Sequence, residues 1–272
     1  MSELIRGAVI GSPIEHSLSP LLHRSALQFL GIEGDYQRNE VPLGTLNDFF
    51  TLHQTEFNYF SITMPLKEEA LTLPVEKDAV ASRIQSANTL YRRDDIWHLT
   101  STDGSGLVSA LKNQGYEKFS KVLILGAGGT ARAVVGALDG LSDEIVVLGR
   151  SSTRREVLEN SVSRSGFEYL RWDDSPAFVD FDLVINTTPA GAADLLAESV
   201  PVGNASLLFD VIYKPWPTVL ASRWSDAGGV VINGLELLLY QGIHQLGLAL
   251  QADLDEISLA KHLRPILQKA HR

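Results

Sequence analysis

The segment most informative about the fold is Val122-Leu123-Ile124-Leu125-Gly126-Ala127-Gly128-Gly129-Thr130-Ala131-Arg132-Ala133. It joins a continuous apolar run, typical of a strand covered on both faces, to a glycine-rich turn and the start of a helix. The pattern G-x-G-x-x-A in this context favours a dinucleotide-binding loop, in which the second glycine lets the backbone approach a pyrophosphate and Ala131 permits close helix packing. A glycine-rich turn without a ligand is the alternative.

Further apolar runs follow at residues 145–148, 183–186, 207–210 and 230–232, and helical segments separate most of them. This βαβ alternation favours a parallel, doubly wound sheet. We therefore predict a Rossmann-type domain over residues 105–234.

The end of the second strand of this domain indicates which dinucleotide binds. In NAD sites that strand usually ends in an acid that binds the ribose 2′-hydroxyl. Here it ends in Gly149-Arg150-Ser151-Ser152-Thr153-Arg154-Arg155, with Arg150 24 positions after Gly126. Two arginines and neighbouring hydroxyls suit a 2′-phosphate, so we predict NADP as the cofactor. The alternative is a solvated basic helix start, a place that the helix dipole makes unfavourable for cations.

The N-terminal region predicts a second α/β domain. Apolar runs at 7–11, 60–63 and 87–91 indicate strands, and Pro20 to Leu30 has helical periodicity with Gly31 as its stop. Residues 105–113 and those from 234 to the C-terminus read as helices. The predicted fold class is thus α/β with two domains: 1–104 plus 235–272 for substrate binding and catalysis, 105–234 for the cofactor, and an interdomain cleft.

Composition excludes several classes of function. The 272 residues contain no cysteine, which rules out disulfides and thiolate metal sites, and the histidines show no metal-ligand spacing. A net charge of −10 argues against nucleic acid as a partner. The N-terminus lacks the apolar region of a signal peptide, and no stretch approaches the roughly 20 apolar residues of a membrane span. We expect a cytoplasmic monomer or homodimer that binds a small-molecule substrate.

Two serines precede the first predicted helix. Ser19-Pro20 is a natural helix start, with Ser19 as N-cap and Pro20 at the first helical position. Capping does not explain Ser17. Two hydroxyls at a helix N-terminus can also hold a carboxylate, although simple capping is the commoner reason for serine there.

A lysine and an aspartate each follow a predicted strand. Lys67 comes shortly after the run 60–63, and Asp103 follows Ser101-Thr102. At neighbouring strand ends they could form a proton-transfer pair, with the carboxylate orienting the ammonium as general acid for carbonyl reduction. From these two residues alone, a surface ion pair is the simpler interpretation.

Read together, the motifs resemble those of the shikimate dehydrogenase family. They are Gly-Ser-Pro-Ile-x-His-Ser-x-Ser-Pro at 11–20, Thr-Met-Pro-x-Lys at 63–67, Ser-Ala-Asn-Thr-Leu at 86–90, Thr-Asp-Gly at 102–104 and Gly-Ala-Gly-Gly-Thr-Ala at 126–131. The segments 210–215 and 234–241 are similar to later motifs of the family, so the resemblance covers nearly the whole chain.

The resemblance implies an NADP-dependent shikimate dehydrogenase, which reversibly reduces the C3 carbonyl of 3-dehydroshikimate. It assigns acid–base catalysis to Lys67 with Asp103 as partner. The substrate-binding residues that it implies are Ser17, Ser19, Thr63, Asn88, Tyr213 and Gln241. The cofactor-binding residues that it implies are Gly126, Ala127, Gly128, Gly129 and Thr130 at the pyrophosphate, Arg150, Ser151 and Arg154 at the 2′-phosphate, and Val211 and Gly234 at the nicotinamide.

Some positions depart from the family pattern. Ser61, Ser101 and Gly149 stand where asparagine is common, Leu237 where methionine is frequent, and Pro189-Ala190 where a serine-rich turn is usual. These departures bear on selectivity rather than on the chemistry. A quinate or dual quinate/shikimate dehydrogenase is the nearest alternative, and a non-catalytic ligand-sensing module of the same fold is a more distant one.

Overall fold

The computed structural model describes residues 4–174, 176–204 and 206–271. The chain divides into two compact units. The first is built from residues up to 106 together with 238–270, and the second from 107–237. Two helices, α4 (Asp103–Asn113) and α8 (Gly234–Leu250), contain the points of division.

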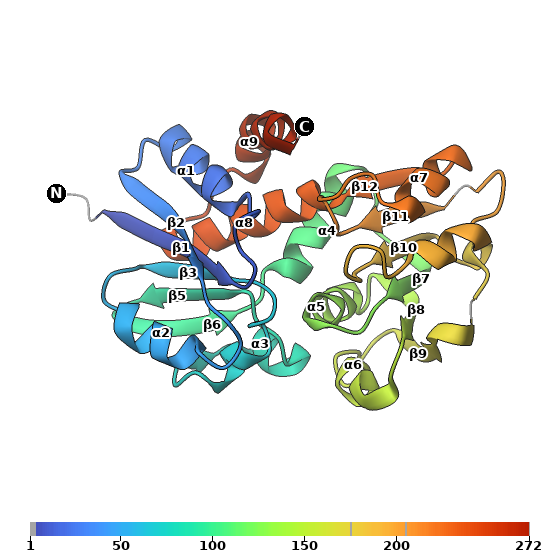
Figure 1. Ribbon diagram of the computed structural model, residues 1–272, viewed down its shortest axis with the longest axis horizontal. Coiled ribbons are helices and arrows are strands. Elements are labelled where there is room, and N and C mark those ends of the chain that lie inside the picture. Colours follow the sequence, from blue (N-terminus) through green and yellow to red (C-terminus); the bar gives the residue numbers. More distant parts are fainter. Residues whose placement is uncertain (1–3, 175, 205, 272) are drawn as a thin grey trace. The chain divides into compact units, whose positions relative to one another are not determined.

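The first unit holds a mixed sheet with the strand order β2-β1-β3-β5-β6-β4 (Figure 1). β1 runs parallel to β2 and β3, whereas β5 runs antiparallel to β3 and β6, and β4 is parallel to β6. The strands are β1 (Ile5–Gly11), β2 (Gly34–Glu40), β3 (Tyr59–Ile62), β4 (Glu76–Lys77), β5 (Thr89–Arg93) and β6 (Ile96–Thr100). The remaining helices of this unit are α1 (Ser19–Phe29), α2 (Leu46–His53), α3 (Ala79–Ile84) and α9 (Glu256–His271).

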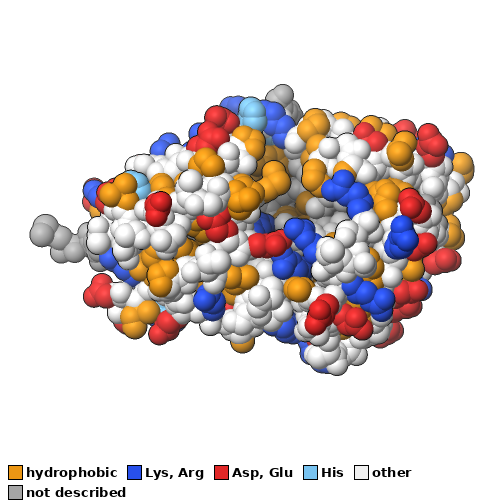
Figure 2. Space-filling view, turned by 60° about the horizontal axis from the view of Figure 1, so that its bottom comes forward, with side chains coloured by type: hydrophobic (Ala, Val, Ile, Leu, Met, Phe, Trp, Pro, Cys, Tyr) orange, Lys and Arg blue, Asp and Glu red, His pale blue; other side chains and the backbone are white. Residues whose placement is uncertain are grey.

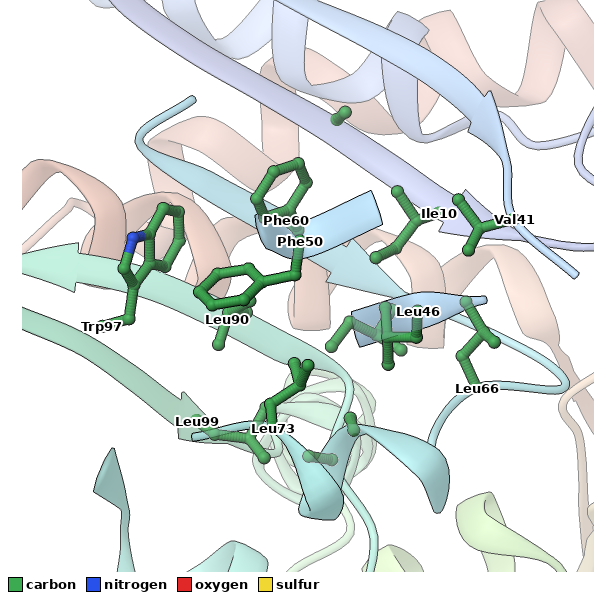
Figure 3. Packing of buried hydrophobic residues seen from close by; sticks show 14 of the residues in the cluster. Ile10, Val41, Leu46, Phe50, Phe60, Leu66, Leu73, Leu90, Trp97 and Leu99 are labelled. Carbon is green, nitrogen blue, oxygen red and sulfur yellow. The ribbon is translucent and has the colours of Figure 1, made fainter. Parts of the chain in front are cut away.

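An aromatic and aliphatic core holds α2 and the loops against this sheet (Figure 3). Trp97 of β6 lies within it, with ring centroids 5.4 Å from Phe50 of α2 and 5.5 Å from Phe60 of β3. All three side chains are buried. Their burial fixes β3 and β6, the two strands that lead to Lys67 and Asp103.

The second unit holds a wholly parallel sheet in the order β12-β11-β10-β7-β8-β9, stacked from top to bottom in Figure 1. Numbered within the unit, this is the doubly wound order 3-2-1-4-5-6, and the order reverses between β7 and β10. The strands are β7 (Phe119–Leu125), β8 (Ser142–Gly149), β9 (Gly166–Arg171), β10 (Leu183–Asn186), β11 (Leu207–Asp210) and β12 (Val230–Asn233). Its helices are α5 (Gly129–Leu138), α6 (Arg155–Glu159) and α7 (Val219–Asp226).

The α/β fold class and the doubly wound sheet predicted from the sequence are confirmed. No helix in the described ranges combines the length and the apolar character that crossing a membrane requires. Figure 2 shows basic and acidic side chains interspersed over the visible face.

Candidate active site

The predicted catalytic residues lie at one edge of the first sheet, because the strands that precede or follow them end or begin there. β1 and β3 are parallel, so both end at this edge. β5 runs the opposite way and begins here, with Thr89 paired to Ser61 near the end of β3 and to Thr100 at the end of β6. The segments that hold Lys67, Asn88 and Asp103 therefore leave or enter the sheet side by side.

Lys67 and Asp103 form a close ion pair. Nζ of Lys67 lies 2.5 Å from Oδ2 of Asp103, and the two side chains are 17% and 7% exposed. Their burial distinguishes them from exposed surface pairs, which contribute little to stability and are screened by salt. Asp103 is also the first residue of α4, where a carboxylate is favoured by the helix dipole.

Asn88 is the centre of the surrounding hydrogen-bond network. Its Nδ2 donates to Oδ1 of Asp103 at 2.7 Å and to Oε1 of Gln241 at 3.2 Å. Its Oδ1 accepts from the hydroxyl of Thr89 at 2.7 Å, and from the amide and the hydroxyl of Thr102 at 2.7 and 3.2 Å. Both N–H groups of the Asn88 side chain thus donate hydrogen bonds, which fixes the orientation of the amide. The bond to Oδ1 in turn fixes the orientation of the Asp103 carboxylate.

Gln241 brings α8 to this edge. Its Nε2 donates to the carbonyl oxygen of Leu238 at 2.9 Å, and its own backbone carbonyl oxygen accepts from the Thr102 hydroxyl at 3.1 Å. A Cβ atom at Gly106 would lie 2.6 Å from the Gln241 backbone nitrogen. The absence of a side chain at Gly106 therefore allows α4 and α8 to approach closely enough to share this network.

Gln245, which was not predicted as part of the site, forms a second layer of polar contacts next to Asn88. Nε2 of Gln245 donates to the carbonyl oxygen of Asn88 and to the hydroxyl of Thr89, both at 3.0 Å. Its Oε1 accepts from the Ser61 hydroxyl at 2.6 Å, and Ser61 in turn accepts from the Tyr36 hydroxyl. Gln245 lies one helical turn after Gln241, and this i,i+4 spacing is the signal that could have revealed it.

Ser17 and Ser19 lie at the start of α1, but not as predicted. The helix begins at Ser19, and the cap position is Leu18, which forms no side-chain capping hydrogen bond. The prediction of Ser19 as N-cap is therefore wrong: Ser17 Oγ instead accepts from the Ser19 amide at 3.3 Å. Arg38 of β2 fixes this loop by donating to the Ser17 carbonyl oxygen at 3.0 Å from Nε and 2.7 Å from Nη2.

Thr63 lies at the same edge of the sheet, directly after β3. Its amide donates to the carbonyl oxygen of Ile10 at 3.0 Å, and its methyl group would be 2.5 Å from a Cβ atom at Gly11. Gly11 thus lets the loop that leads to the two serines pass close to the loop that leads to Lys67.

In the second unit, the glycine loop follows β7 at the point where the strand order reverses. Gly126 has a φ of +104°, and a Cβ atom there would lie 2.8 Å from the Thr187 hydroxyl, so conformation and space both require glycine. Gly128 has an extended backbone and caps α5 without a side-chain hydrogen bond, and a Cβ atom there would meet only Nη1 of Arg154, at 3.8 Å. The first amides of α5 can therefore face an anion, as a pyrophosphate site requires.

The arginines predicted to bind a 2′-phosphate lie beside this loop. Arg150, Ser151 and Arg154 are exposed and lie between β8 and α6. Nη1 of Arg154 donates to the carbonyl oxygen of Ala127 at 3.4 Å, so the guanidinium group reaches the glycine loop. This juxtaposition is consistent with one dinucleotide occupying both places.

The remaining predicted residues follow β11 and β12. Gly234 has no room for a side chain because Val211 lies against its α-carbon. The turn after β11 is fixed by Asp210, which accepts from Thr218 and Asn186 at 2.7 and 3.1 Å. Burial raises the pKa of Asp210, although these hydrogen bonds oppose the shift. Tyr213 belongs to this unit, and its contact with the substrate stays a prediction.

Comparisons with known proteins agree with this geometry. The family described as the shikimate dehydrogenase substrate binding domain matches residues 9–90. The NADP(+) shikimate dehydrogenase of Ignicoccus hospitalis is 33% identical over 239 residues, which are 87% of this chain and 89% of that protein. This chain belongs to the shikimate dehydrogenase family.

Solved structures of the family share the fold over nearly the full length. Shikimate dehydrogenase from Mycobacterium tuberculosis is 32% identical with a TM-score of 0.86, covering 96% of this chain and 99% of that one. The enzyme from Thermus thermophilus, solved in complex with NADP(H) and shikimate, is 30% identical with a TM-score of 0.83, covering 96% of this chain and 99% of that one.

Proposed function

We propose that this protein catalyses the reversible NADPH-dependent reduction of 3-dehydroshikimate to shikimate. The observation that carries the proposal is the buried Lys67–Asp103 pair, 2.5 Å apart and oriented by Asn88, in a chain of the shikimate dehydrogenase family. A non-catalytic ligand-sensing module should tolerate the loss of this pair, so the presence of both residues counts against that alternative.

The second unit fits an NADP cofactor. The loop Gly126–Thr130 would hold the pyrophosphate, Arg150, Ser151 and Arg154 the 2′-phosphate, and Val211 and Gly234 the nicotinamide side. The fit rests on the backbone at Gly126 and Gly128, where side chains are absent and α5 begins without a side-chain cap. When bound, NADPH supplies the hydride for carbonyl reduction.

Lys67 would transfer the proton. In the reducing direction its ammonium group donates a proton to the carbonyl oxygen of the substrate, and in the oxidising direction the neutral amine takes the proton back from the hydroxyl. Asp103 would orient Nζ and balance its charge. Because Asn88 donates to the second oxygen of Asp103, the carboxylate cannot rotate away without breaking a 2.7 Å hydrogen bond.

The substrate would be held by Ser17, Ser19, Thr63, Asn88, Tyr213 and Gln241. The serine hydroxyls suit the carboxylate of shikimate, and the amides suit its ring hydroxyls. Gln241 is better placed than Asn88 to donate to a ligand. One Gln241 N–H bonds to Leu238 and the second has no acceptor among the described residues, whereas both Asn88 N–H groups are already engaged.

The test is an absorbance assay for reduced nicotinamide with purified protein, offering shikimate or quinate with NADP⁺ or NAD⁺ in all four combinations. We expect the highest kcat/KM for shikimate with NADP⁺. Turnover confined to quinate and NAD⁺ would contradict the proposal, and no turnover in any pair would favour a ligand-sensing module.

A further inference from the structure

At Gly149, where the family often has asparagine, the phenol of Tyr169 on the neighbouring strand occupies the space that a side chain would need. β9 pairs with β8 so that Tyr169 lies opposite Val147 and Arg171 opposite Gly149. The phenol of Tyr169 extends toward the end of β8, and its hydroxyl lies well inside contact distance of where a Cβ atom at Gly149 would be. Any side chain at position 149 therefore requires this phenol to move.

The Tyr169 hydroxyl is bonded to the segment that carries the proposed 2′-phosphate ligands. It donates to the carbonyl oxygen of Ser151 at 2.5 Å. Ser151 Oγ in turn accepts from the amide of Thr153 at 3.3 Å and lies 3.1 Å from its hydroxyl. These bonds form the turn that leads into the short 3₁₀ helix Ser152–Arg154. A side chain of β9 thus fixes a loop that is otherwise exposed to solvent.

The charges around Tyr169 allow it to act as a donor at neutral pH. Burial raises the pKa of its hydroxyl, and the positive charge of Arg154 only partly opposes the shift. The hydroxyl therefore keeps its proton, which is the proton donated to Ser151. Arg154 is near enough to Tyr169 for its charge to act on the phenol, and its Nη1 reaches the carbonyl oxygen of Ala127 in the glycine loop.

We propose that Tyr169 is a positioning residue for cofactor selectivity: it holds the Arg150–Arg154 segment so that the segment favours a dinucleotide with a 2′-phosphate. The inference rests on the proposed function for the cofactor class. The phenol occupies the space that a side chain at position 149 would need. From the neighbouring strand, its hydroxyl stabilises the turn at Ser151.

The test measures binding without catalysis, by titration calorimetry with adenosine 2′,5′-bisphosphate and with 5′-AMP. Tyr169→Phe keeps the ring over Gly149 and removes only the hydroxyl. We expect it to weaken binding of the bisphosphate about three- to tenfold, the factor that one lost hydrogen bond corresponds to, and to leave 5′-AMP unchanged. Tyr116→Phe, at a half-buried tyrosine of the same unit, is the matched control and should change neither affinity.

A double substitution tests whether a side chain at position 149 and the phenol of Tyr169 compete for the same space. Gly149→Asn alone collides with the phenol and should weaken bisphosphate binding. Gly149→Asn combined with Tyr169→Ala removes the collision and should bind the bisphosphate more tightly than Gly149→Asn alone, which is a non-additive effect expected of residues in contact.

Two results would overturn the inference: an unchanged ratio of bisphosphate to 5′-AMP affinity in Tyr169→Phe, or additive effects in the double variant. Failure of the proposed function has a different signature. In that case the unsubstituted protein would bind both probes equally or would fail to oxidise shikimate, whatever Tyr169 does.

Discussion

The side-chain amide of Asn88 donates a 2.7 Å hydrogen bond to Oδ1 of Asp103, the carboxylate oxygen that is not the one closest to Lys67. Asp103 is therefore held from both sides, by an ammonium group on one oxygen and an amide on the other. This arrangement separates the Lys67–Asp103 pair from an ordinary ion pair, because neither partner can take up another rotamer without breaking a buried contact.

Asn88→Asp should move the pH dependence of the reaction. The substitution replaces a donor to Asp103 with a second carboxylate at the same place, and two adjacent carboxylates raise the pKa of the pair. We expect the acidic limb of the kcat/KM profile to shift to higher pH, and kcat at pH 7 to fall by about tenfold or more.

The control for that substitution is Asn58→Asp. Asn58 directly precedes β3, at the end of that strand opposite Lys67, and accepts from the Arg6 amide at 2.8 Å. Asn58→Asp therefore adds the same charge away from the site. A profile of Asn88→Asp that coincides with that of Asn58→Asp would show that Asn88 does not set the state of Asp103.

Ser19→Ala should weaken substrate binding more than it slows turnover. Because Ser19 is the first residue of α1 and not its cap, its hydroxyl is not needed to start the helix. We expect the KM for shikimate to rise about tenfold, the loss of a hydrogen bond to a charged group, with kcat changed much less. Ser25→Ala on the same helix is the control, and equal effects of the two substitutions on KM would remove Ser19 from the proposed carboxylate site.

Because His23 is buried, we expect the free energy of unfolding to fall on mild acidification. Its ring stacks on Tyr36 with centroids 4.1 Å apart, and Nδ1 lies 3.0 Å from the Tyr59 hydroxyl. Burial lowers the pKa of His23 to about 3, and the neighbouring Gln245 opposes this only in part. In the unfolded chain the pKa of His23 is near the ordinary value of about 6.5. Below that pH the unfolded chain therefore binds a proton at His23 that the folded chain does not bind.

The direction of this effect follows from the lowered pKa of His23. The stabilisation from the neutral ring is complete above about pH 6.5 and is lost as the pH falls from about 6.5 toward 3, at about 1.4 kcal/mol per pH unit over most of that window. Urea unfolding between about pH 7 and 5 should show a steeper fall in stability for the unsubstituted protein than for His23→Gln. His16→Gln, at an exposed histidine, is the comparison. Parallel slopes for His23→Gln and the unsubstituted protein would refute the assignment.

The sequence predicted the inner strands of the second sheet and its edge strand β12, but it did not predict the edge strands β2 and β9. β7, β8, β10 and β11 are buried runs of apolar residues, which a search for continuous apolar stretches detects. β2 was not predicted, because its only fully buried residue is Tyr36 and the rest of the edge strand is polar. β9, which carries Tyr169, was not predicted either, because it is an edge strand whose side chains are half-buried or exposed.

The site could be predicted only in part from the sequence. The motifs identified Lys67, Asn88, Asp103 and Gln241, but nothing in their spacing shows that Asn88 orients Asp103, since that depends on β5 running antiparallel to β3. Ser61 and Gln245 lie 184 positions apart and are joined by a 2.6 Å hydrogen bond that no local pattern encodes. The roles of the individual residues stay predictions until the substitutions are made.

The most direct test of the proposed chemistry is the effect of Lys67→Ala on the oxidation of shikimate by NADP⁺, with kcat from steady-state rates and shikimate affinity from calorimetry. If Lys67 is the acid–base group, kcat should fall by about 100-fold or more, the usual contribution of a positioned proton donor, while shikimate affinity changes by less than about fivefold. A kcat near that of the unsubstituted protein would contradict the assignment of Lys67 as the acid–base group.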